Sequence, residues 1–567
     1  MTAELTRAPM RTPAAPASEG PSLRARLLGL GSVFGKTIRD SRRAMLIVGG
    51  ISAALVLVIA YAIVTEFNTP ESRKEIARVI AAVPPIMQGL AGSGFNAETL
   101  GGYIQYKYGG FFPLVTGLWS ILALSGTLAA EIRRGSLDFV AAGPVGRRRI
   151  ALEKVLAHAT MVFVAMALIM GSLWLAGTAF AALPGDEIPF SAAIGYALWL
   201  GLMALASGSV AFAVAPFLGR GAALAIAGGL MFLGFIINGY RTAIPELGRF
   251  ADLTWFGWTN DHIPLASRYD WTSVGLTAGF AVVMLAIGVE AFARRDLGST
   301  IALPLPRLPH ALLGLRGPFG RSLSERLPTA LSWGVGIGFF GLMMASVGDT
   351  FTEQLAQAPG FRAALETLFP DVDIASTGGF LELVFVEFGL ILAGLAGASL
   401  VSGWASDETS GRLELLLATP LQRTRWAVAS GLGVLVGVVI VMLLTAAGIA
   451  VGGSTAGSDF GTAVLGSGAV GLYGGALAGV GMAVGGIFGA GVAGTVVVAI
   501  TILTWLLDFL VPSLDLPSWL QQLALSSHMG QPMLGVWDVP GIVLCLALAV
   551  GGVVVGALAF ARRDLRG

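Results

Sequence analysis

The chain has 567 residues, of which 55% are hydrophobic and only 12% are charged, and its mean hydropathy is +0.79. Soluble domains carry about 25% charged residues, so this composition excludes an ordinary soluble enzyme and predicts an all-α integral membrane protein. The formal net charge of +1 gives no electrostatic reason to expect nucleic acid binding. The single cysteine, Cys545, excludes disulfides within the chain and thiolate metal cages.

The N-terminal region is expected to stay on the cytosolic side of the membrane. Residues 1–22 are polar, rich in Ala and Pro, and lack a cleavable signal pattern, which predicts a disordered cytosolic tail. Residues 23–43 mix apolar and basic side chains, as an interfacial helix does. The stretch Leu30–Thr37, LGSVFGKT, approaches a phosphate-binding loop but lacks its first glycine and the preceding strand. We therefore predict no nucleotide, cofactor or metal site on this chain.

Apolar runs of about 20 residues, the length that crosses ~30 Å of hydrocarbon as a helix, recur along the chain. Those in the first half are Met45–Val64, Phe111–Ala130, Leu156–Ala181, Ser191–Ala215, Ala222–Asn238 and Ser273–Phe292. Those in the second half are Ala330–Val347, Phe380–Gly403, Ala427–Val451, Gly461–Ile487, Gly491–Leu510 and Gly541–Phe560. Lys and Arg near the ends of spans mark the cytosolic side of the membrane. With an even number of crossings, all the Lys- and Arg-rich span ends of this chain fall on that side. The sequence thus predicts twelve spans in the cell membrane, with both termini cytosolic.

One outer segment carries a run of charges. Arg73, Lys74, Glu75 and Arg78 lie between the first two spans, and their spacing favours the solvated face of an amphipathic helix.

A polar loop between spans occurs twice. Residues 131–149 read EIRRGSLDFVAAGPVGRRR, and residues 407–425 read DETSGRLELLLATPLQRTR. Acid, Gly-x-Leu-acid, Ala-x-Pro and Arg-x-Arg recur in register, through Glu131 and Asp407, Gly135 and Gly411, Asp138 and Glu414, Pro144 and Pro420, Arg147 and Arg423. A single basic loop is explained as a topology determinant, but topology requires neither the glycine nor the acid. We predict that each loop forms a short surface helix that docks on a soluble partner.

Two further segments are duplicated. Residues 27–30 (LLGL) recur at 312–315, and residues 291–297 (AFARRDL) recur at 559–565. The sequence therefore predicts two parallel six-span repeats, residues 23–297 and 325–567, joined by a cytosolic linker with a second interfacial helix at 298–324. Parallel repeats imply a pseudo-two-fold axis along the membrane normal, with the transport path between the halves.

These features resemble the ABC-2 type permeases of ATP-driven exporters, whose loop between the second and third spans carries an acid, G-x-L-E and P-x-x-R. The fused form resembles membrane subunits of polyketide-antibiotic (tetronasin-type) exporters. The resemblance implies export of hydrophobic drug-like compounds, powered by two copies of a separate ATPase subunit that binds ATP and Mg. It assigns docking to two coupling loops, 131–149 and 405–425, through Glu131, Gly135, Asp138, Pro144, Arg147, Asp407, Glu408, Gly411, Glu414, Pro420 and Arg423. The first loop departs from the pattern at Asp138 and Gly143.

Three acids fall within or beside spans. Glu382 and Glu387 lie in the eighth span and Asp508 in the eleventh. Because burying a charge in lipid costs at least ~2.5 kcal/mol, they are candidates for the substrate path or a proton relay. Alternatively, all three lie near the outer ends of their spans and reach water. An ion-gradient-driven secondary transporter using Glu387 and Asp508 is the alternative to ATP-driven export.

The glycine-rich run from Gly466 to Gly494 predicts close helix packing. Aromatic and Met residues such as Phe340 and Met344 fit helix packing better than a ligand site. A membrane-embedded lipid enzyme is the least supported alternative, since no cluster of His, Asp or Ser accompanies the spans.

Overall fold

The computed structural model describes residues 32–83, 88–89, 92, 94–126, 146–294, 317–368, 372–409, 411–456, 460–513 and 517–563. Within these residues, 11 helices are long and apolar enough to cross a membrane. The count rises to 12 if Leu100–Tyr108 and Phe111–Gly126, which meet at an angle of 49°, form one bent span. Large apolar side chains such as Phe163 and Leu465, each 73% exposed, lie on span surfaces, as lipid-facing residues do. The chain is therefore an all-α, multi-pass membrane protein.

The first half begins with a long helix and continues as spans joined by short helices. Its elements are α2 (Val33–Glu66), α3 (Pro70–Ala81), α5 (Leu100–Tyr108), α6 (Phe111–Gly126), α9 (Arg147–Ala179), α10 (Phe190–Tyr240), η1 (Pro245–Leu247), α11 (Gly248–Ala251), α12 (Trp255–Trp258), η2 (Pro264–Ala266) and α13 (Trp271–Arg294).

The second half follows the same order and ends with a small β-hairpin before its last span. Its elements are α14 (Gly317–Ala356), α15 (Pro359–Leu368), α16 (Thr377–Leu381), the π-helical turn η4 (Glu382–Val386), α17 (Glu387–Thr409), α18 (Arg412–Leu417), α19 (Arg423–Ala456), α20 (Gly461–Phe488), η5 (Ala490–Val492), α21 (Ala493–Ser513), η6 (Ser518–Leu523), η7 (Leu525–His528), β1 (Gly530–Gln531), η8 (Pro532–Leu534), β2 (Val536–Trp537) and α22 (Val539–Arg562). The strands β1 and β2 pair antiparallel, with Gly530 opposite Trp537.

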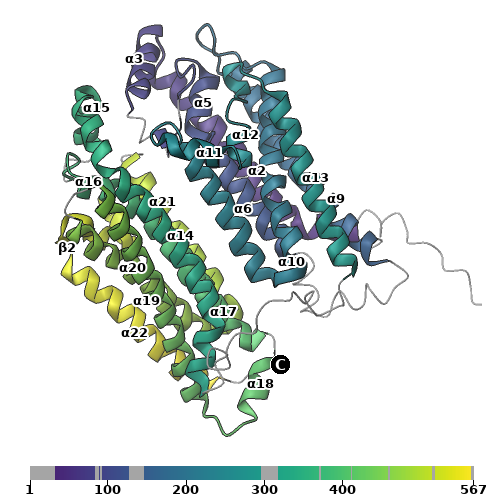
Figure 1. The fold of residues 1–567 in the computed structure, drawn as a ribbon, viewed down its shortest axis with the longest axis vertical. Helices are drawn as coiled ribbons and strands as arrows, with labels where there is room; N and C mark the ends of the chain where they lie inside the picture. The colour runs from purple at the N-terminus through teal and green to yellow at the C-terminus, as the bar shows by residue number, and fades with distance from the viewer. Residues whose placement is uncertain are drawn as a thin grey trace, which may run out of the picture.

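The same helix pairs form in both halves. In the first half α2 packs along α9 and α10 packs against both α6 and α13. In the second half α14 packs along α19, and α20 packs against both α17 and α22. Figure 1 shows the first half, purple to teal, beside the second half, which runs from teal at α14 to yellow at α22. This repeated pairing agrees with two parallel six-span repeats, while the pseudo-two-fold axis stays a prediction.

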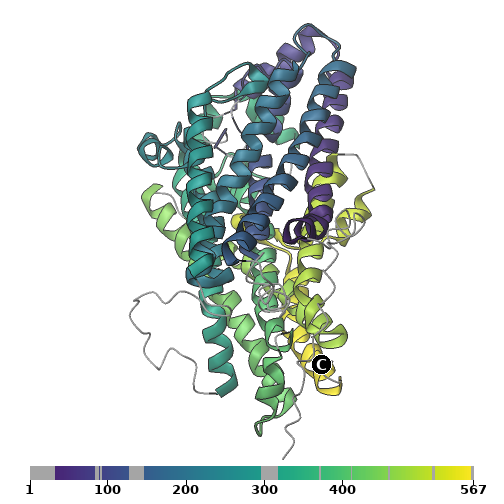
Figure 2. The same cartoon turned by 90° about the vertical axis from the view of Figure 1, so that its right-hand side faces the viewer.

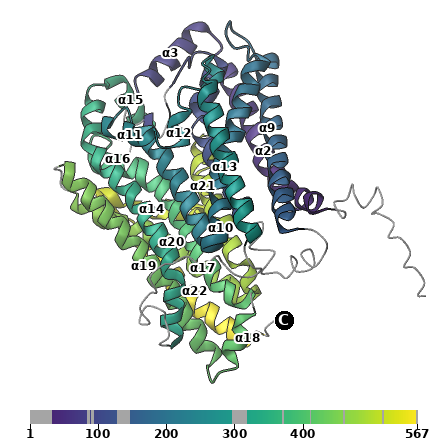
Figure 3. The same ribbon diagram turned by 45° about the vertical axis from the view of Figure 1, so that its right-hand side comes forward.

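The helices run roughly side by side along the long dimension of the molecule (Figure 2). The short helices α3 and α15 lie at one end, and α18 lies at the other (Figures 1 and 3). We call the end with α18 the repeat end, because the described parts of the second repeated loop and of the second AFARRDL lie there, and the other the opposite end. Residues 33–43 and 317–324, which the sequence assigns to interfacial helices, are continuous with the long helices α2 and α14.

Breaks in the helices also recur at matching places. Gly219 (φ 79°) interrupts α10 between the fourth and fifth spans, and Gly489 (φ 116°) separates α20 from η5 and α21 at the equivalent point. Positive φ is accessible to glycine without steric cost, so each glycine permits the turn between consecutive spans. The second span of each half is also irregular, bent between α5 and α6 in one half and π-helical at η4 in the other.

Glycine packing in the second half is confirmed. A Cβ on Gly479 would lie 2.2 Å from the carbonyl oxygen of Leu548, and one on Gly486 would lie 2.3 Å from that of Gly556. Both contacts bring α20 against α22 within the same half, so close backbone approach there requires glycine.

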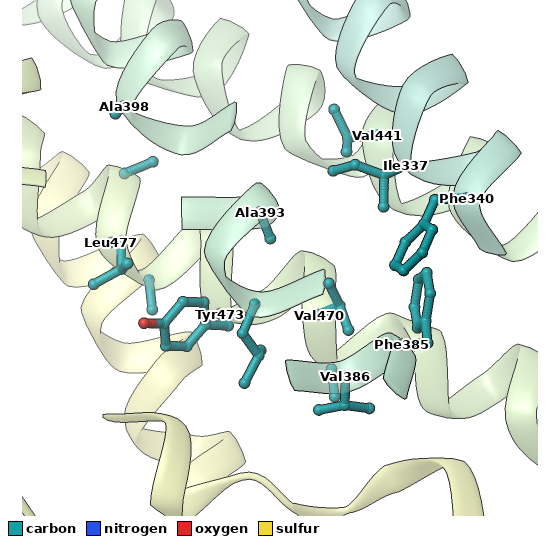
Figure 4. Packing of buried hydrophobic residues seen from close by; sticks show 14 of the residues in the cluster. Ile337, Phe340, Phe385, Val386, Ala393, Ala398, Val441, Val470, Tyr473 and Leu477 are labelled. Carbon is teal, nitrogen blue, oxygen red and sulfur yellow. The ribbon is translucent and has the colours of Figure 1, made fainter. Parts of the chain in front are cut away.

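Aromatic residues connect the two halves. The rings of Phe232 on α10 and Phe340 on α14 lie 5.8 Å apart, and the Tyr240 hydroxyl lies 3.3 Å from the Met344 sulfur. Phe340 also stacks on Phe385 at 5.5 Å, at the edge of the second-half core (Figure 4). Phe340 and Met344 are buried, so these side chains pack between helices, as the sequence favours.

Candidate functional site

Arg321, the second repeated loop and the described part of the second AFARRDL, far apart in sequence, meet at the repeat end. Arg563, in the second AFARRDL, donates from Nη2 to both carboxylate oxygens of Glu408 at 2.6 Å. Arg423 donates from Nη1 to the backbone carbonyl of Arg563 at 3.0 Å. Arg321, which follows the repeated LLGL, lies 3.6 Å from Asp407. We call the surface formed by Arg321, residues 407–425 and Arg563 the platform.

The short helix α18 is the outermost element of the platform. Gly411 precedes it with φ 72°, a left-handed conformation that favours glycine. Leu413 points inward and is 1% exposed, whereas Leu415 is 75% exposed and Glu414 is exposed beside it. The helix ends at Leu417, and Pro420 follows where the chain turns back into α19. The second loop therefore contains the predicted short surface helix, with an apolar side chain and a carboxylate directed outward.

Sequence reasoning missed the buried groups that support this loop. Arg326 on α14 is 2% exposed and donates from Nη1 to the backbone carbonyl of Ser322 at 2.7 Å and to its Oγ at 2.8 Å. Ser322 Oγ in turn donates to the carbonyl of Ser430 on α19 at 3.0 Å. A charged residue four positions before the apolar run Ala330–Val347 was the available signal. This network joins α14 to α19 directly beneath the platform.

The same end of the first half carries a comparable set of contacts. Arg148 on α9 pairs with Glu290 on α13, and Arg294, in the first AFARRDL, donates to Glu290 at 2.9 Å. The backbone N–H of Phe34 on α2 donates to Glu153 at 3.2 Å. Arg147 begins α9. Glu131, Gly135, Asp138 and Pro144 of the first loop lie outside the described residues.

The acids of the eighth and eleventh spans contact the segment between α21 and α22. Glu382 is 9% exposed and accepts a hydrogen bond from the backbone N–H of Met533 at 2.8 Å. Asp508 is half-buried and accepts a hydrogen bond from the Ser526 hydroxyl. The backbone of Glu387 begins α17, and its side chain is outside the described set. Glu382 and Asp508 thus hold the segment between α21 and α22 in place. A contact of either acid with substrate stays a prediction.

Arg73 corrects the sequence interpretation of α3. The sequence places it on a solvated face, but it is 2% exposed and pairs with Asp186, which is 1% exposed. Two guanidinium nitrogens donate to the carboxylate at 3.0 and 3.2 Å, and the backbone N–H groups of Leu100 and Leu183 also donate to it. The neighbouring Lys74, Glu75 and Arg78 are exposed as predicted. The pair fixes α3 to the α9–α10 connection at the opposite end.

Comparison with known proteins supports a transport subunit. Residues 315–561 match the family model described as "Multidrug efflux system permease Rv1217c, C-terminal domain". The chain is 27% identical over 536 residues to "Multidrug efflux system permease protein Rv1217c" of Mycobacterium tuberculosis (strain ATCC 25618 / H37Rv), which covers 91% of each chain. The similarity therefore extends over both halves, and the matched family region contains the whole platform except Arg563.

Proposed function

We propose that this chain is the permease subunit of an ATP-driven exporter that moves hydrophobic drug-like or antibiotic compounds out of the cell. In this proposal two copies of a separate ATPase subunit, which binds ATP and Mg, dock on the two cytosolic coupling loops. The chain itself catalyses no reaction and forms the path through the bilayer between its halves. The similarity to a multidrug efflux permease supports the substrate class and the direction.

The contacts of the second loop with Arg321 and Arg563 carry the proposal. Ion pairs tie the end of α17, which directly precedes α18, to α14 and to the end of α22, so force applied to α18 would reach spans at the start and end of the second half through α17. Glu414 and Leu415 face outward and offer a charge and an apolar anchor to a partner. A loop that served only to orient the spans would need neither the outward leucine nor the ion pairs behind it.

The ion-gradient alternative requires Glu387 and Asp508. Asp508 accepts a hydrogen bond from Ser526, in the segment between α21 and α22, which explains this acid by folding. The side chain of Glu387 lies outside the described residues.

Gentle extraction of the tagged chain from its native membrane tests the proposal. We expect a soluble ATPase to co-purify at about twice the molar amount of the chain, because each coupling loop seats one copy. A Glu414→Arg variant should lose the ATPase while inserting into the membrane normally, and Glu353→Arg, on the exposed opposite end of α14, is the matched control. Recovery of the chain alone, with transport that collapses when the ion gradient is removed, would overturn the proposal in favour of the alternative.

A further inference from the structure

The connections between the last two spans of each half differ in charge. In the second half, residues 517–537 between α21 and α22 contain no Asp, Glu, Lys or Arg. Their only ionisable side chain, His528, hydrogen-bonds the backbone carbonyl of Gln522 at 2.9 Å. The equivalent connection of the first half, residues 241–270 between α10 and α13, carries the charged side chains of Arg241, Glu246, Arg249, Asp252, Asp261, Arg268 and Asp270. The two halves therefore present chemically different surfaces at the opposite end.

Large apolar side chains lie on the surface of the uncharged connection. Trp519 and Leu523 on η6 are 60% and 65% exposed, and Val536 on β2 is 59% exposed. The exposed apolar surface continues onto α22 through Val539 and Val543. Figure 1 shows β2 at the edge of the molecule, where α22 begins. The apolar surface of the connection is thus continuous with the lipid-facing side of a span.

Exposed apolar residues in the first-half connection are interrupted by charges. Phe250 and Leu253 are exposed, but Arg249 and Asp252 directly precede them and are exposed as well. Moving this surface into lipid would remove water from a guanidinium and a carboxylate, which is costly. The first-half connection is therefore suited to water and serves as the internal comparison.

Contacts with the spans place the uncharged connection level with the span ends. A Cβ on Gly466, five residues after the start of α20 at Gly461, would lie 2.3 Å from the carbonyl oxygen of Pro532. Five helical residues span about 7.5 Å, so η8 lies alongside the first turns of this span. Ser526 donates to Asp508, the last residue of the apolar span Ala490–Asp508. Interfacial segments bury their apolar faces ~5–10 Å into the boundary between headgroups and acyl chains, which is the depth that these contacts indicate.

We propose that residues 517–537 form a lipid-binding surface that inserts into the headgroup–acyl boundary of the leaflet at the opposite end, through Trp519, Leu523 and Val536. Trp is enriched at this boundary, and the absence of Lys and Arg means that insertion needs no anionic headgroups. A soluble partner on this surface would also have to cover Val539 and Val543 on α22, so the continuity favours lipid. The bilayer therefore holds the second half by a contact that the first half lacks.

Spin labels on single cysteines of the full-length chain in phosphatidylcholine nanodiscs test the proposal. Leu523→Cys and Val536→Cys report on the surface, Val543→Cys on the lipid-facing side of α22, and Glu246→Cys on the exposed first-half connection. The wild-type chain, labelled in parallel, corrects for any reaction at the buried Cys545. Power saturation measures the collision of each label with oxygen and with a water-soluble nickel chelate.

We expect the ratio of oxygen to nickel accessibility at Leu523 and Val536 to exceed that at Glu246 by about tenfold, because apolar oxygen partitions into lipid and the polar chelate does not. The ratio at Val543 should be at least as high. Addition of anionic phosphatidylglycerol should leave the ratio at Leu523 unchanged.

A ratio at Leu523 and Val536 equal to that at Glu246 would place the surface in water and overturn the proposal. Low accessibility to both reagents would show that protein covers the surface and would overturn it too, as would insertion that requires anionic lipid. Melting temperatures establish that the variants are folded, and the two reporting positions lie on separate elements, so either one tests the surface alone. The experiment uses no ATPase, so its failure is distinct from failure of the proposed function.

Discussion

Arg563 and Glu408, 155 residues apart, form a two-point contact in which one guanidinium nitrogen donates to both carboxylate oxygens at 2.6 Å. The side chains are only 15% and 14% exposed, so solvent screens the pair weakly. A Cβ on Gly489, at the turn before α21, would lie 3.0 Å from Nη1 of the same arginine. Arg563 thus lies where the end of α22, the end of α17 and the turn between α20 and α21 meet.

Reversal of this ion pair should be rescued by the double reversal. We expect Glu408→Arg and Arg563→Glu each to reduce co-purification of the ATPase by about tenfold, since hydrogen bonds to charged groups contribute about 1.5–3 kcal/mol. The double variant should recover most of the loss, because it restores opposite charges at the same distance. ATPase recovery per mole of chain measures the effect, and additive losses in the double variant would show that the two residues act independently.

The exposed face of α18 should determine docking through one apolar contact as well as through Glu414. Leu415→Asp is expected to lower ATPase affinity by about 10–100-fold, as loss of a buried apolar anchor costs about 1.5–3 kcal/mol. Thr419→Asp, an exposed position just beyond the same helix, is the matched control and should have little effect. Binding of the purified ATPase to immobilised chain measures both, and equal losses would contradict an anchoring role for Leu415.

The Arg73–Asp186 pair should contribute strongly to stability at the opposite end. Breaking a buried ion pair costs about 3–5 kcal/mol, and Asp186 also accepts hydrogen bonds from the backbone N–H groups of Leu100, Ala182 and Leu183. We expect Asp186→Ala to lower the melting temperature of the purified chain and to expose α3 to limited proteolysis. Lys74→Ala removes an exposed charge from the same helix and should change neither measurement. A stable, protease-resistant Asp186→Ala variant would contradict this role.

The approach of α20 to α22 should tolerate no side chain at Gly479. Gly479→Ala places a methyl group 2.2 Å from a backbone carbonyl, and overpacking of this kind costs about 1–3 kcal/mol. Gly468→Ala on the same helix meets only the sulfur of Met442, at 3.8 Å, and should be neutral. Melting temperatures of the two variants in the same detergent make the comparison, and equal values would show that the helices separate without cost.

Replacing Asp508 by a neutral residue distinguishes ATP-driven export from ion-gradient-driven transport. In an ATP-driven exporter Asp508→Asn should keep export within about twofold of wild type, because asparagine can still accept a hydrogen bond from Ser526. A secondary transporter coupled through this carboxylate would lose gradient-driven transport. Efflux measured with ATP depleted and with the ion gradient collapsed, each in turn, distinguishes the two outcomes.

The sequence by itself determined the class, the approximate spans and the repeated loop with its surface helix. The spans depend on local composition, because a chain in lipid must satisfy its backbone hydrogen bonds within each apolar helix. Gly411 and Pro420 set the two ends of α18, whatever that helix packs against. Only the tertiary structure decided which charges meet. Arg73 reaches Asp186 across 113 residues and Glu382 reaches the backbone of Met533 across 151. Such partners depend on how separate helices pack, which the periodicity of any one segment does not encode. The same physical reason explains why the sequence identified Glu408 and Arg423 as loop residues but did not show that both bind Arg563.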